Sequence, residues 1–410
     1  MNILILNHYA STPKHGSAET RHYEIAKRLV KRGHGVIIAV GDYSHLLGKK
    51  WSELTDSFRF LEDGIEFQVI KTRFYTGNGV DRLLSSCDYY KNGKTSLVVD
   101  NVDTIVASSP HPLTWPLAHY LSKKRGIPFL IEIRDVWPDD LISMGALKKS
   151  HPVVPYFRHL CRKYYPRSEG IISLVPDLNE HFKSLKLKTL PRFYVIPNGI
   201  DISVFENPKK CPEAEIILSK VPQDTLKVLY TGSHGPSNGL INVLKQLAHV
   251  PPKLRRNFSF IFVGRGPEKS KLISFAVEEK LSNVFFFDPI PKECIYYLIS
   301  CADVLLFSLL PFEGTKFPAY SSFKLMDYMA SGKPIISVNL QGLILKETQG
   351  AVFYDIYDSE SFESALKLLL NTDMETLKKM GERNKRYIQK NRDWSVIAEK
   401  FEEVLKEVST

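Results

Sequence analysis

The 410-residue chain contains few cysteines and no long apolar run. Its five cysteines form no C-x-x-C pair and no zinc-ligand spacing, which predicts a reduced, cytosolic protein without a structural metal. The longest apolar stretch, Val304–Phe312, falls far short of the roughly 18 to 20 residues that span a bilayer. The N-terminal sequence MNILILNHY lacks the basic segment of a signal peptide. We therefore expect neither a membrane-spanning nor an exported protein.

Repetitive and low-complexity tracts are also missing. Hydrophobic residues make up 43% of the chain, which is enough to build packed cores and excludes a disordered or fibrous protein. A chain of this length outgrows one core and should divide into two domains of roughly 200 residues each.

Short apolar runs alternate with helical patterns through both halves of the chain. The first run, Asn2–His8, predicts a buried strand, and Ser17 can cap the helix that follows it. Further strands are predicted at Val36–Val40, Ile65–Ile70, Asp103–Ser108, Pro128–Ile133, Gly170–Val175, Phe193–Ile196, Leu226–Thr231, Phe258–Val263, Val284–Phe287, Asp303–Ser308 and Pro334–Val338. This alternation predicts an α/β protein with two consecutive Rossmann-like domains, each a parallel sheet covered by helices on both faces.

Dinucleotide and P-loop fingerprints are absent from the loop after the first strand of each half. The loop Ala10–Ser17 lacks G-x-G-x-x-G, and no Walker lysine follows the loop Gly232–Gly239. Both loops lead into a helix, where free N–H groups favour anions, and the glycines let the backbone approach a phosphate. An ordinary turn is the alternative for each loop.

The most informative segment is Ser321–Ile336, with the sequence SSFKLMDYMASGKPII. A serine can cap a helix whose first turn contains Lys324, and Asp327 follows three residues later. A helix N-terminus with a lysine suits a pyrophosphate, and a carboxylate can accept hydrogen bonds from ribose hydroxyls. Taken alone, the segment also fits a surface helix with ordinary caps.

With this segment the chain resembles the family 4 glycosyltransferases, a retaining class of GT-B fold that transfers sugars from nucleotide-sugars. SFKLMDYMASGKPII is similar to the family signature P-S-K-L-x-E-Y-M-A-x-G-K-P-V-I. Further similarities occur, in the family's order, at Asn7–Ala10, Gly33–Val36, Glu132–Pro138, Ile196–Asp201, Val263–Pro267 and Trp394. The resemblance runs from residue 2 to about residue 408 and is closest to the branch that builds bacterial surface polysaccharides.

The resemblance implies a domain for each substrate. Residues 1–203 would bind the acceptor and residues 204–391 the nucleotide-sugar, with the two domains facing each other across a cleft. Residues 392–410 would form a helix that returns to the first domain.

The resemblance also implies roles for single residues. Ser322, Phe323 and Lys324 would hold the donor diphosphate, and Asp327 would contact the nucleotide ribose. Gly16 would meet donor and acceptor near the cleft. The remaining residues expected at the donor are Gly232, Ser233, Asn238 and Arg265, and the expected catalytic residues are Arg134, beneath the transferred sugar, and Asp135 beside it.

Three positions depart from the family pattern. Ala319 stands where the first Glu of an E-x7-E motif is expected, with Glu313 in the preceding loop as a substitute. Ser233 and Asn238 stand where the family has Arg and Lys. Lys324 is therefore the main expected phosphate cation, with Arg265 or Lys316 as further candidates.

The implied mechanism is front-face transfer with retention of configuration. A leaving diphosphate oxygen would take the acceptor's proton while cations and helix dipoles stabilise the developing charge. No metal or cofactor is expected beyond the nucleotide-sugar. The carboxylate pairs Asp100/Asp103 and Asp139/Asp140 are interpreted as surface caps rather than a D-x-D metal motif.

Positive charge is concentrated in the first half of the chain. Residues 1–200 hold 28 basic and 19 acidic side chains, whereas the other 210 residues hold 27 and 26. Leu141–Ser168 contains no acid and six cations interleaved with aromatic residues. The residues predicted to face an anionic membrane surface or a polyprenyl-diphosphate-linked acceptor are Lys148, Lys149, Arg158, Arg162 and Lys163. The alternative is a solvated basic helix that packs its aromatic residues into the domain; nucleic acid is not expected, because no recognised motif accompanies the charge.

We therefore expect a cytoplasmic glycosyltransferase, peripheral at the inner face of the membrane. It would move a hexosyl or N-acetylhexosaminyl group from a UDP- or similar sugar to a saccharide acceptor that is lipid-linked. Two alternatives stay open: a GT-B nucleotide-sugar epimerase and a catalytically weak nucleotide-sugar-binding partner protein.

Overall fold

The computed structural model describes residues 1–15, 20–45, 48–55, 57–77, 79–109, 111–143, 145, 147–311 and 316–409. The chain divides into two compact units: unit 1 contains Met1–Asn198 and Trp394–Thr410, and unit 2 contains Gly199–Asp393. These boundaries lie a few residues from those expected at 203 and 391. Among the described residues, none of the helices combines the length and apolar composition that a bilayer crossing requires.

Unit 1 is built on an eight-stranded sheet. In spatial order its strands are β3 (Arg59–Glu62), β4 (Ile65–Ile70), β2 (Gly35–Gly41), β1 (Asn2–Leu6), β5 (Thr104–Ser108), β6 (Phe129–Ile133), β7 (Gly170–Ser173) and β8 (Arg192–Val195). All neighbours are parallel except β3 and β4. Asp63 and Gly64, with φ of 51° and 79°, form the two-residue turn of this antiparallel hairpin. The sequence prediction of a purely parallel sheet is therefore wrong at this edge.

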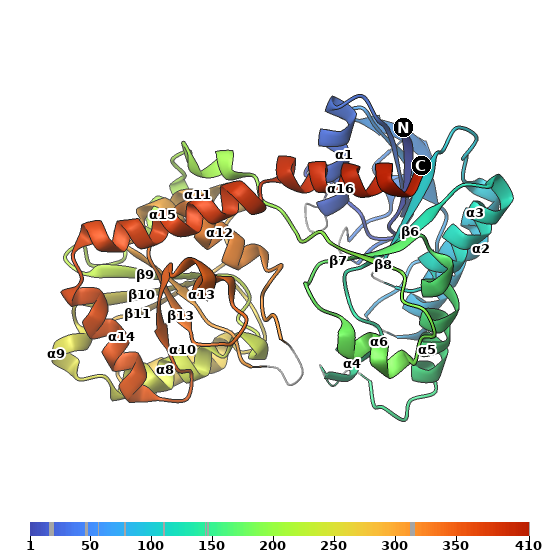
Figure 1. Cartoon of the computed structure of the whole chain (residues 1–410). Helices are drawn as coiled ribbons and strands as arrows, with labels where there is room; N and C mark the ends of the chain where they lie inside the picture. Colours follow the sequence, from blue (N-terminus) through green and yellow to red (C-terminus); the bar gives the residue numbers. More distant parts are fainter. Residues whose placement is uncertain are drawn as a thin grey trace. The chain divides into compact units, whose positions relative to one another are not determined.

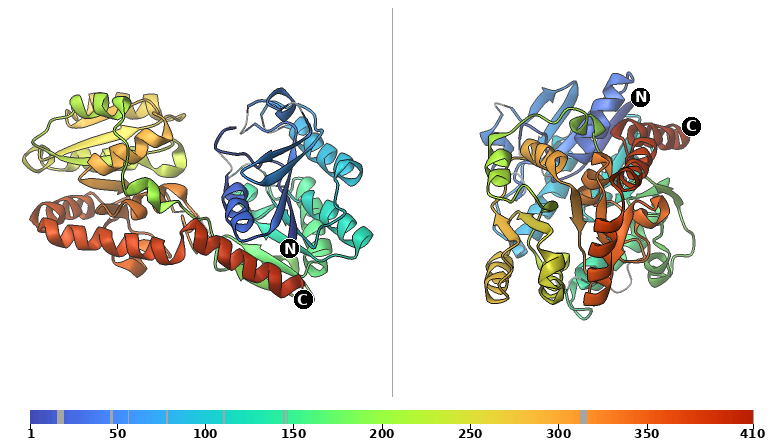
Figure 2. Two further views of the ribbon diagram at one scale, coloured as in Figure 1. Left: turned by 90° about the horizontal axis from the view of Figure 1, so that it is seen from above. Right: turned by 90° about the vertical axis from the view of Figure 1, so that its left-hand side faces the viewer.

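Helices cover both faces of the unit 1 sheet (Figures 1 and 2). One layer contains α1 (Arg21–Lys31) and α16 (Trp394–Ser409), and the other contains α2 (Val80–Ser96), α3 (Thr114–Arg125), α5 (Val153–Tyr164) and α6 (Asn179–Leu185), with the short α4 (Asp139–Ser143) near α5. Along β1, Ile3 and Ile5 enter one core while Leu4 and Leu6 enter the other. Burial on both faces explains why these strands are continuous apolar runs.

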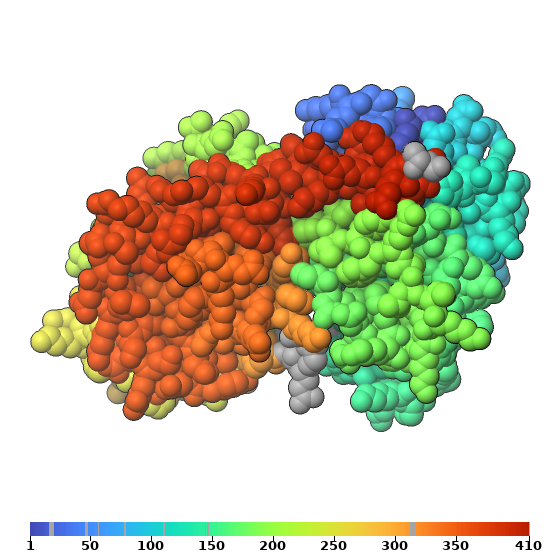
Figure 3. All heavy atoms as spheres, viewed as in Figure 1, coloured from blue at the N-terminus to red at the C-terminus, as the bar shows by residue number. Residues whose placement is uncertain are grey.

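The C-terminal helix α16 completes unit 1. Trp394, Ile397 and Phe401 are buried in the same core as Ile25 and Leu29 of α1. Figure 3 shows the red residues of α16 lying against the blue residues of the N-terminal segment. Unit 1 therefore draws its core from both ends of the sequence.

Unit 2 is built on a six-stranded, wholly parallel sheet. Its strands, in spatial order, are β11 (Val284–Phe287), β10 (Phe258–Val263), β9 (Leu226–Thr231), β12 (Val304–Phe307), β13 (Ile335–Val338) and β14 (Ala351–Tyr354). Its longer helices are α7 (Pro212–Ser219), α8 (Leu240–His249), α10 (Lys269–Glu278), α11 (Lys292–Cys301), α12 (Phe323–Ser331), α14 (Ser359–Asn371) and α15 (Met374–Asn391); α9 (Pro252–Arg255) and α13 (Ile344–Thr348) are short. Strand order reverses between β9 and β12, and ligands of open α/β sheets bind at such a point, beyond the carboxyl ends of the strands.

Two of the five cysteines are paired. Cys211, directly before α7, and Cys294, in the first turn of α11, form a disulfide, whereas Cys87, Cys161 and Cys301 are free thiols. The prediction of a chain with only reduced cysteines is therefore wrong for this pair. No local pattern indicates the pairing, because the two residues are 83 positions apart and meet only when α7 packs against α11.

Candidate functional site

The loop after β9 passes very close to helix α12. Gly232, the first residue of this loop, has φ of 134° and donates its N–H to Val263 O over 3.0 Å. A Cβ at this position would lie 2.9 Å from Lys324 Cε. Glycine is therefore needed both for the backbone conformation and for the space that the lysine side chain occupies.

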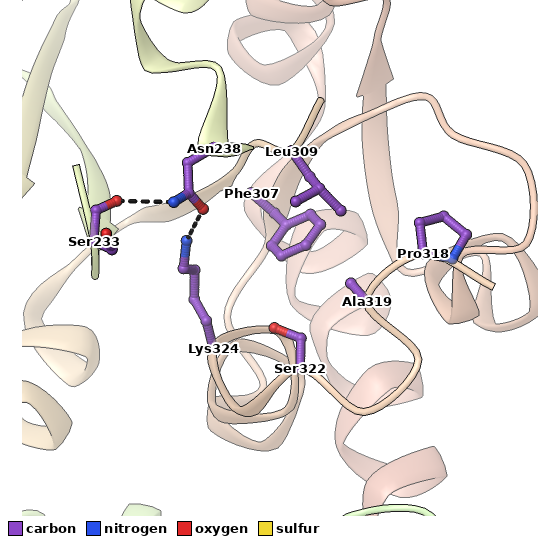
Figure 4. A pocket seen from close by; sticks show the side chains of 8 residues that line it. All are labelled: Ser233, Asn238, Phe307, Leu309, Pro318, Ala319, Ser322 and Lys324. Atoms are coloured by element: carbon purple, nitrogen blue, oxygen red, sulfur yellow. Dashed lines mark hydrogen bonds between the residues drawn. The ribbon is translucent and has the colours of Figure 1, made fainter. Parts of the chain in front are cut away.

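Lys324, in the first turn of α12, points across this loop (Figure 4). Its Nζ donates to Asn238 Oδ1 over 2.8 Å and to Tyr230 Oη over 2.7 Å, and it lies 4.2 Å from the centre of the Tyr230 ring. Burial lowers the pKa of Lys324 to about 7. Both hydrogen-bond acceptors are neutral, and within the described residues no carboxylate forms an ion pair with this ammonium.

Asn238 and Tyr230 are themselves held in place by one carbonyl. Ser233 O accepts from Tyr230 Oη over 2.7 Å and from Asn238 Nδ2 over 3.0 Å. Because the Asn238 amide nitrogen faces this carbonyl, its oxygen is turned toward Lys324. Tyr230 is not among the residues expected at the site; it lies within the predicted strand Leu226–Thr231.

A pocket of about 320 Å³ opens beside these residues. It is lined by Ser233, Asn238, Phe307, Leu309, Pro318, Ala319, Ser322 and Lys324 (Figure 4). Lys324 is the one charged residue among these eight, so the described lining of the pocket offers an anion a single cation. Ala319 does line the pocket at the position where the resemblance expects a Glu.

The start of α12 also faces this pocket. Ser322 caps the helix with its Oγ, which accepts from Leu325 N over 3.4 Å. The first N–H groups of an α-helix have no partner within the helix, so this terminus can bind an anion next to Lys324. One turn further on, Tyr328 Oη accepts from Thr231 N over 2.8 Å and ties α12 to the end of β9.

Other predicted donor residues are not brought into the pocket. Asp327, three residues after Lys324, is half-buried, and burial raises its pKa to about 6, although Lys292 opposes the shift. Phe323 is 38% exposed with Lys292 Nζ 5.9 Å from its ring centre. Arg265 is exposed, and its backbone O accepts from His234 N over 2.9 Å. Gly16 and Glu313 lie outside the described residues.

In unit 1, the predicted catalytic residues directly follow strand β6. The backbone N–H groups of Arg134 and Asp135 both donate to Ser109 Oγ, over 2.9 and 3.4 Å. Ser109 itself follows β5, so these residues lie at the carboxyl edge of the sheet. Arg134 is half-buried and Asp135 exposed.

A fully buried ionic network lies beneath this edge, and sequence reasoning missed it. Glu132, the fourth residue of β6, accepts from Arg21 Nη2 over 2.8 Å, from His22 Nε2 over 2.7 Å and from Ser108 Oγ over 2.6 Å. Burial acts to raise the pKa of Glu132, but Arg21 and His22 outweigh it and hold the pKa well below its usual value. Arg21 also donates to the carbonyl of Ile196, so one guanidinium joins α1, β6 and the segment after β8.

The basic segment of unit 1 includes α5, which carries Arg158, Arg162 and Lys163. Its apolar residues Val154, Phe157, Leu160 and Tyr164 are buried in the unit 1 core. The sequence alternative of aromatic residues that pack into the domain therefore holds for these positions, and they are not available to enter a membrane.

The basic face of α5 stays exposed. His159, Arg162, Lys163 and Arg167 line a shallow pocket of about 400 Å³, and Lys148 and Lys149 are exposed nearby in sequence. Arg158 differs from the other predicted cations because it pairs with Asp139 over 3.2 Å.

Two family models match the chain. Residues 18–204 match the model described as Glycosyltransferase Family 4, and residues 215–394 match the model described as Glycosyl transferases group 1.

Curated relatives are distant and matched in part. The chain is 23% identical over 245 residues to the probable glycosyltransferase WbjE of Pseudomonas aeruginosa, which is 58% of each chain. It is 23% identical over 221 residues to the putative teichuronic acid biosynthesis glycosyltransferase TuaH of Bacillus subtilis, covering 52% of this chain and 50% of that one. The chain thus spans about half the length of the curated relatives it matches.

Similar solved structures extend over nearly the whole chain. Sucrose-phosphate synthase from Thermosynechococcus elongatus has a TM-score of 0.70 at 14% identity and covers 99% of this chain and 98% of that chain. HepE of Anabaena, solved in complex with UDP-glucose, has a TM-score of 0.66 at 16% identity and covers 99% and 100%. At these identities the likeness shows the fold alone. Because the two family models account for both units and the fold agrees, the chain belongs to the family 4 glycosyltransferases of GT-B fold.

Proposed function

We propose that this protein is a retaining glycosyltransferase that takes its sugar from a UDP-sugar bound in the pocket of unit 2. The observation that carries the proposal is Lys324, a half-buried ammonium at the N-terminus of α12, beside the carboxyl ends of β9 and β12. Its partners Asn238 and Tyr230 are neutral. Burying a charge is costly without a counter-charge, so a diphosphate would supply the anion that the protein itself does not.

The departures at Ser233 and Asn238 fit this arrangement. Where the resemblance expects two further cations, the chain has an amide and a backbone carbonyl that orient a single lysine. The diphosphate would be bound by Lys324, the first N–H groups of α12 and the glycine-bearing loop after β9. As the bond to the sugar breaks, the same groups would stabilise the charge on the leaving diphosphate.

The relatives support a uridine donor and a role in cell-surface glycans. HepE has been solved with UDP-glucose, and TuaH is named for teichuronic acid biosynthesis. We therefore propose a saccharide acceptor, with Arg134 and Asp135 at the carboxyl edge of the unit 1 sheet as the catalytic residues. The exposed basic face of α5 supports a lipid-linked acceptor at an anionic membrane surface.

Donor binding tests this proposal directly. The full chain should be stabilised thermally by UDP-glucose or another UDP-sugar and should release UDP from it slowly. Lys324→Ala should lower donor affinity at least tenfold, whereas Lys379→Ala, on the exposed side of α15, should leave it unchanged. If no member of a nucleotide-sugar panel binds or is hydrolysed, the enzyme assignment fails.

A second function is favoured by one observation, the presence of Ala319 in the pocket. Without a carboxylate there, the protein could bind a nucleotide-sugar and transfer it poorly, as a partner of another transferase. The variant Ala319→Glu distinguishes the transferase from the binding partner. A large gain in UDP release with unchanged donor affinity supports the binding role. No gain, in a wild type that already turns over, supports the transferase.

Sedimentation with vesicles tests the membrane part. The protein should bind vesicles rich in anionic lipid at low salt and dissociate at high salt. Arg162→Glu/Lys163→Glu should lose this binding, whereas Lys253→Glu/Lys271→Glu, with the same charge change on exposed residues of unit 2, should retain it. Absence of binding at low salt would contradict the proposal.

A further inference from the structure

Three side chains that can bind a metal gather where α7 packs against α11. Cys211 and Cys294 have their Cα atoms 5.3 Å apart, and Glu213 lies in the first turn of α7. Glu213 Oε2 is 2.9 Å from Cys211 Sγ and 3.5 Å from Cys294 Sγ. The three ligand atoms all lie within 4.8 Å of one another.

The position of the Glu213 carboxylate is not explained by the disulfide. A disulfide sulfur has no hydrogen to donate, so it offers this anion no hydrogen bond. Glu213 is exposed, yet within the described residues it pairs with no basic side chain, and the nearby Lys210 is bound to Glu215 over 2.9 Å. Reduction of the disulfide would account for this carboxylate better. The two thiols could donate hydrogen bonds to it, or the two thiolates and the carboxylate could bind the same cation.

We propose that, when the disulfide is reduced, Cys211, Cys294 and Glu213 bind one zinc-class divalent cation, with water as the fourth ligand. The same pair of cysteines thus exists either as a cross-link or as a metal site. Thiolates and a carboxylate are both ligands of zinc, and three protein ligands with an open fourth position are a common arrangement. The exposed Glu213 provides a route for the ion to the two buried sulfurs.

Metal binding would change the separations of the three ligand atoms. With metal bonds of about 2.3 Å to sulfur and 2.0 Å to oxygen, tetrahedral angles place sulfur and oxygen about 3.5 Å apart and the two sulfurs about 3.8 Å apart. The separation of Glu213 Oε2 from Cys294 Sγ, 3.5 Å, matches the sulfur–oxygen value, whereas its separation from Cys211 Sγ, 2.9 Å, would have to lengthen. The two sulfurs would have to move apart by rotation of the two cysteine side chains, each of which lies at or near the N-terminus of a helix.

The chemistry balances with a thiol as reductant. Two molecules of a small thiol give their hydrogens to Cys211 and Cys294, break the S–S bond and leave as one small-molecule disulfide. The cation then replaces the two thiol protons, so two protons are released for each ion bound. The N-terminal ends of α7 and α11 favour the thiolate forms that this step requires.

Cobalt(II) provides a visible probe for the site. The full chain is prepared metal-free in oxidised form and in reduced form with the reductant removed, and each is titrated with Co²⁺. The reduced protein should bind one equivalent and show thiolate-to-cobalt charge-transfer absorption, which Zn²⁺ should displace; the oxidised protein should show neither. Cys211→Ser/Cys294→Ser should abolish the absorption, and Glu213→Gln should weaken Co²⁺ binding at least tenfold. Cys301→Ser is the matched control, and it should bind like the reduced wild type.

Two results would overturn the proposal. Reduced wild-type protein without charge-transfer absorption would exclude the metal site, as would absorption that survives in the Cys211→Ser/Cys294→Ser variant. A thiol titration of denatured, air-oxidised protein that counts five thiols instead of three would exclude the cross-linked state. Because the reduced wild type is itself one arm, the test does not depend on the variants folding.

Discussion

A single lysine carries most of the proposed donor chemistry, and its burial should make donor affinity depend on pH. The pKa of Lys324 is lowered to about 7 by burial, so the unliganded protein loses this positive charge as the pH rises above neutrality. A diphosphate binds best to the charged form. Affinity for UDP-glucose, whose phosphates do not titrate in this range, should therefore be constant below pH 7 and fall by up to about tenfold for each pH unit above it.

Calorimetric titration between pH 6 and 9 measures this dependence. Lys324→Arg keeps its charge throughout and should bind with a nearly flat pH profile, even if more weakly. A flat profile in the wild type would contradict the assignment of the diphosphate to Lys324. The stability of the fold should depend on pH in the opposite direction to donor affinity. Between about pH 7 and pH 10 the unfolded lysine binds more protons than the folded one, so the contribution of Lys324 to the free energy of unfolding rises with pH.

Gly232 gives a second prediction at the level of one residue. With φ of 134° and only 2.9 Å between an added Cβ and Lys324 Cε, alanine would strain the backbone and displace the lysine. We expect Gly232→Ala to cost about 1 to 3 kcal/mol of unfolding free energy and to weaken donor binding. Urea denaturation with and without UDP-glucose checks both effects. Gly79→Ala, where no atom lies within 4 Å of an added Cβ, is the control and should leave donor binding unchanged.

At the level of elements, the Glu132 network joins parts of unit 1 that are distant in sequence. Glu132→Gln removes the negative charge and leaves Arg21 buried without its ionic partner. This change should lower the free energy of unfolding by about 3 to 5 kcal/mol. Arg21→Met/Glu132→Leu, which removes both charges, should be much less destabilising than the sum of the single changes Arg21→Met and Glu132→Leu. A double-mutant cycle by chemical denaturation measures the coupling, and additive effects would show that the pair does not act as a unit.

Features that depend on neighbouring residues in the sequence could be predicted, whereas features that depend on tertiary contacts could not. Strands such as Phe258–Val263 were evident because burial on both faces makes a continuous apolar run. The edge strand Arg59–Glu62 was missed although Asp63-Gly64 is a hairpin signal, because its charged ends obscured the strand pattern. Lys324 and Asn238 were predicted for the same site from the resemblance. The roles of Tyr230 and Glu132, and the pairing of Cys211, depend on tertiary contacts that no local pattern contains.

At the level of the whole molecule, α16 is the element on which unit 1 depends most. Ending the chain after Asp393 would expose the core that Trp394, Ile397 and Phe401 now fill. Burial of three large apolar side chains stabilises a fold by roughly 5 kcal/mol or more. Unit 1 should therefore lose most of its stability, while unit 2 keeps its own thermal transition. Scanning calorimetry resolves the two transitions. Deleting only Ser409 and Thr410 should leave both in place, and an unchanged unit 1 transition in the longer truncation would contradict this role for α16.

The position of α16 in the sequence has a consequence for synthesis of the protein. The strands of unit 1 leave the ribosome before unit 2, but the helix α16, which covers one face of their sheet, is encoded after all of unit 2. Unit 1 therefore stays incompletely folded, with one apolar face of its sheet exposed to solvent, while unit 2 is translated. A polypeptide that stops anywhere within unit 2 keeps that face open permanently, and chaperones or proteases that bind apolar surface can distinguish it from the finished protein.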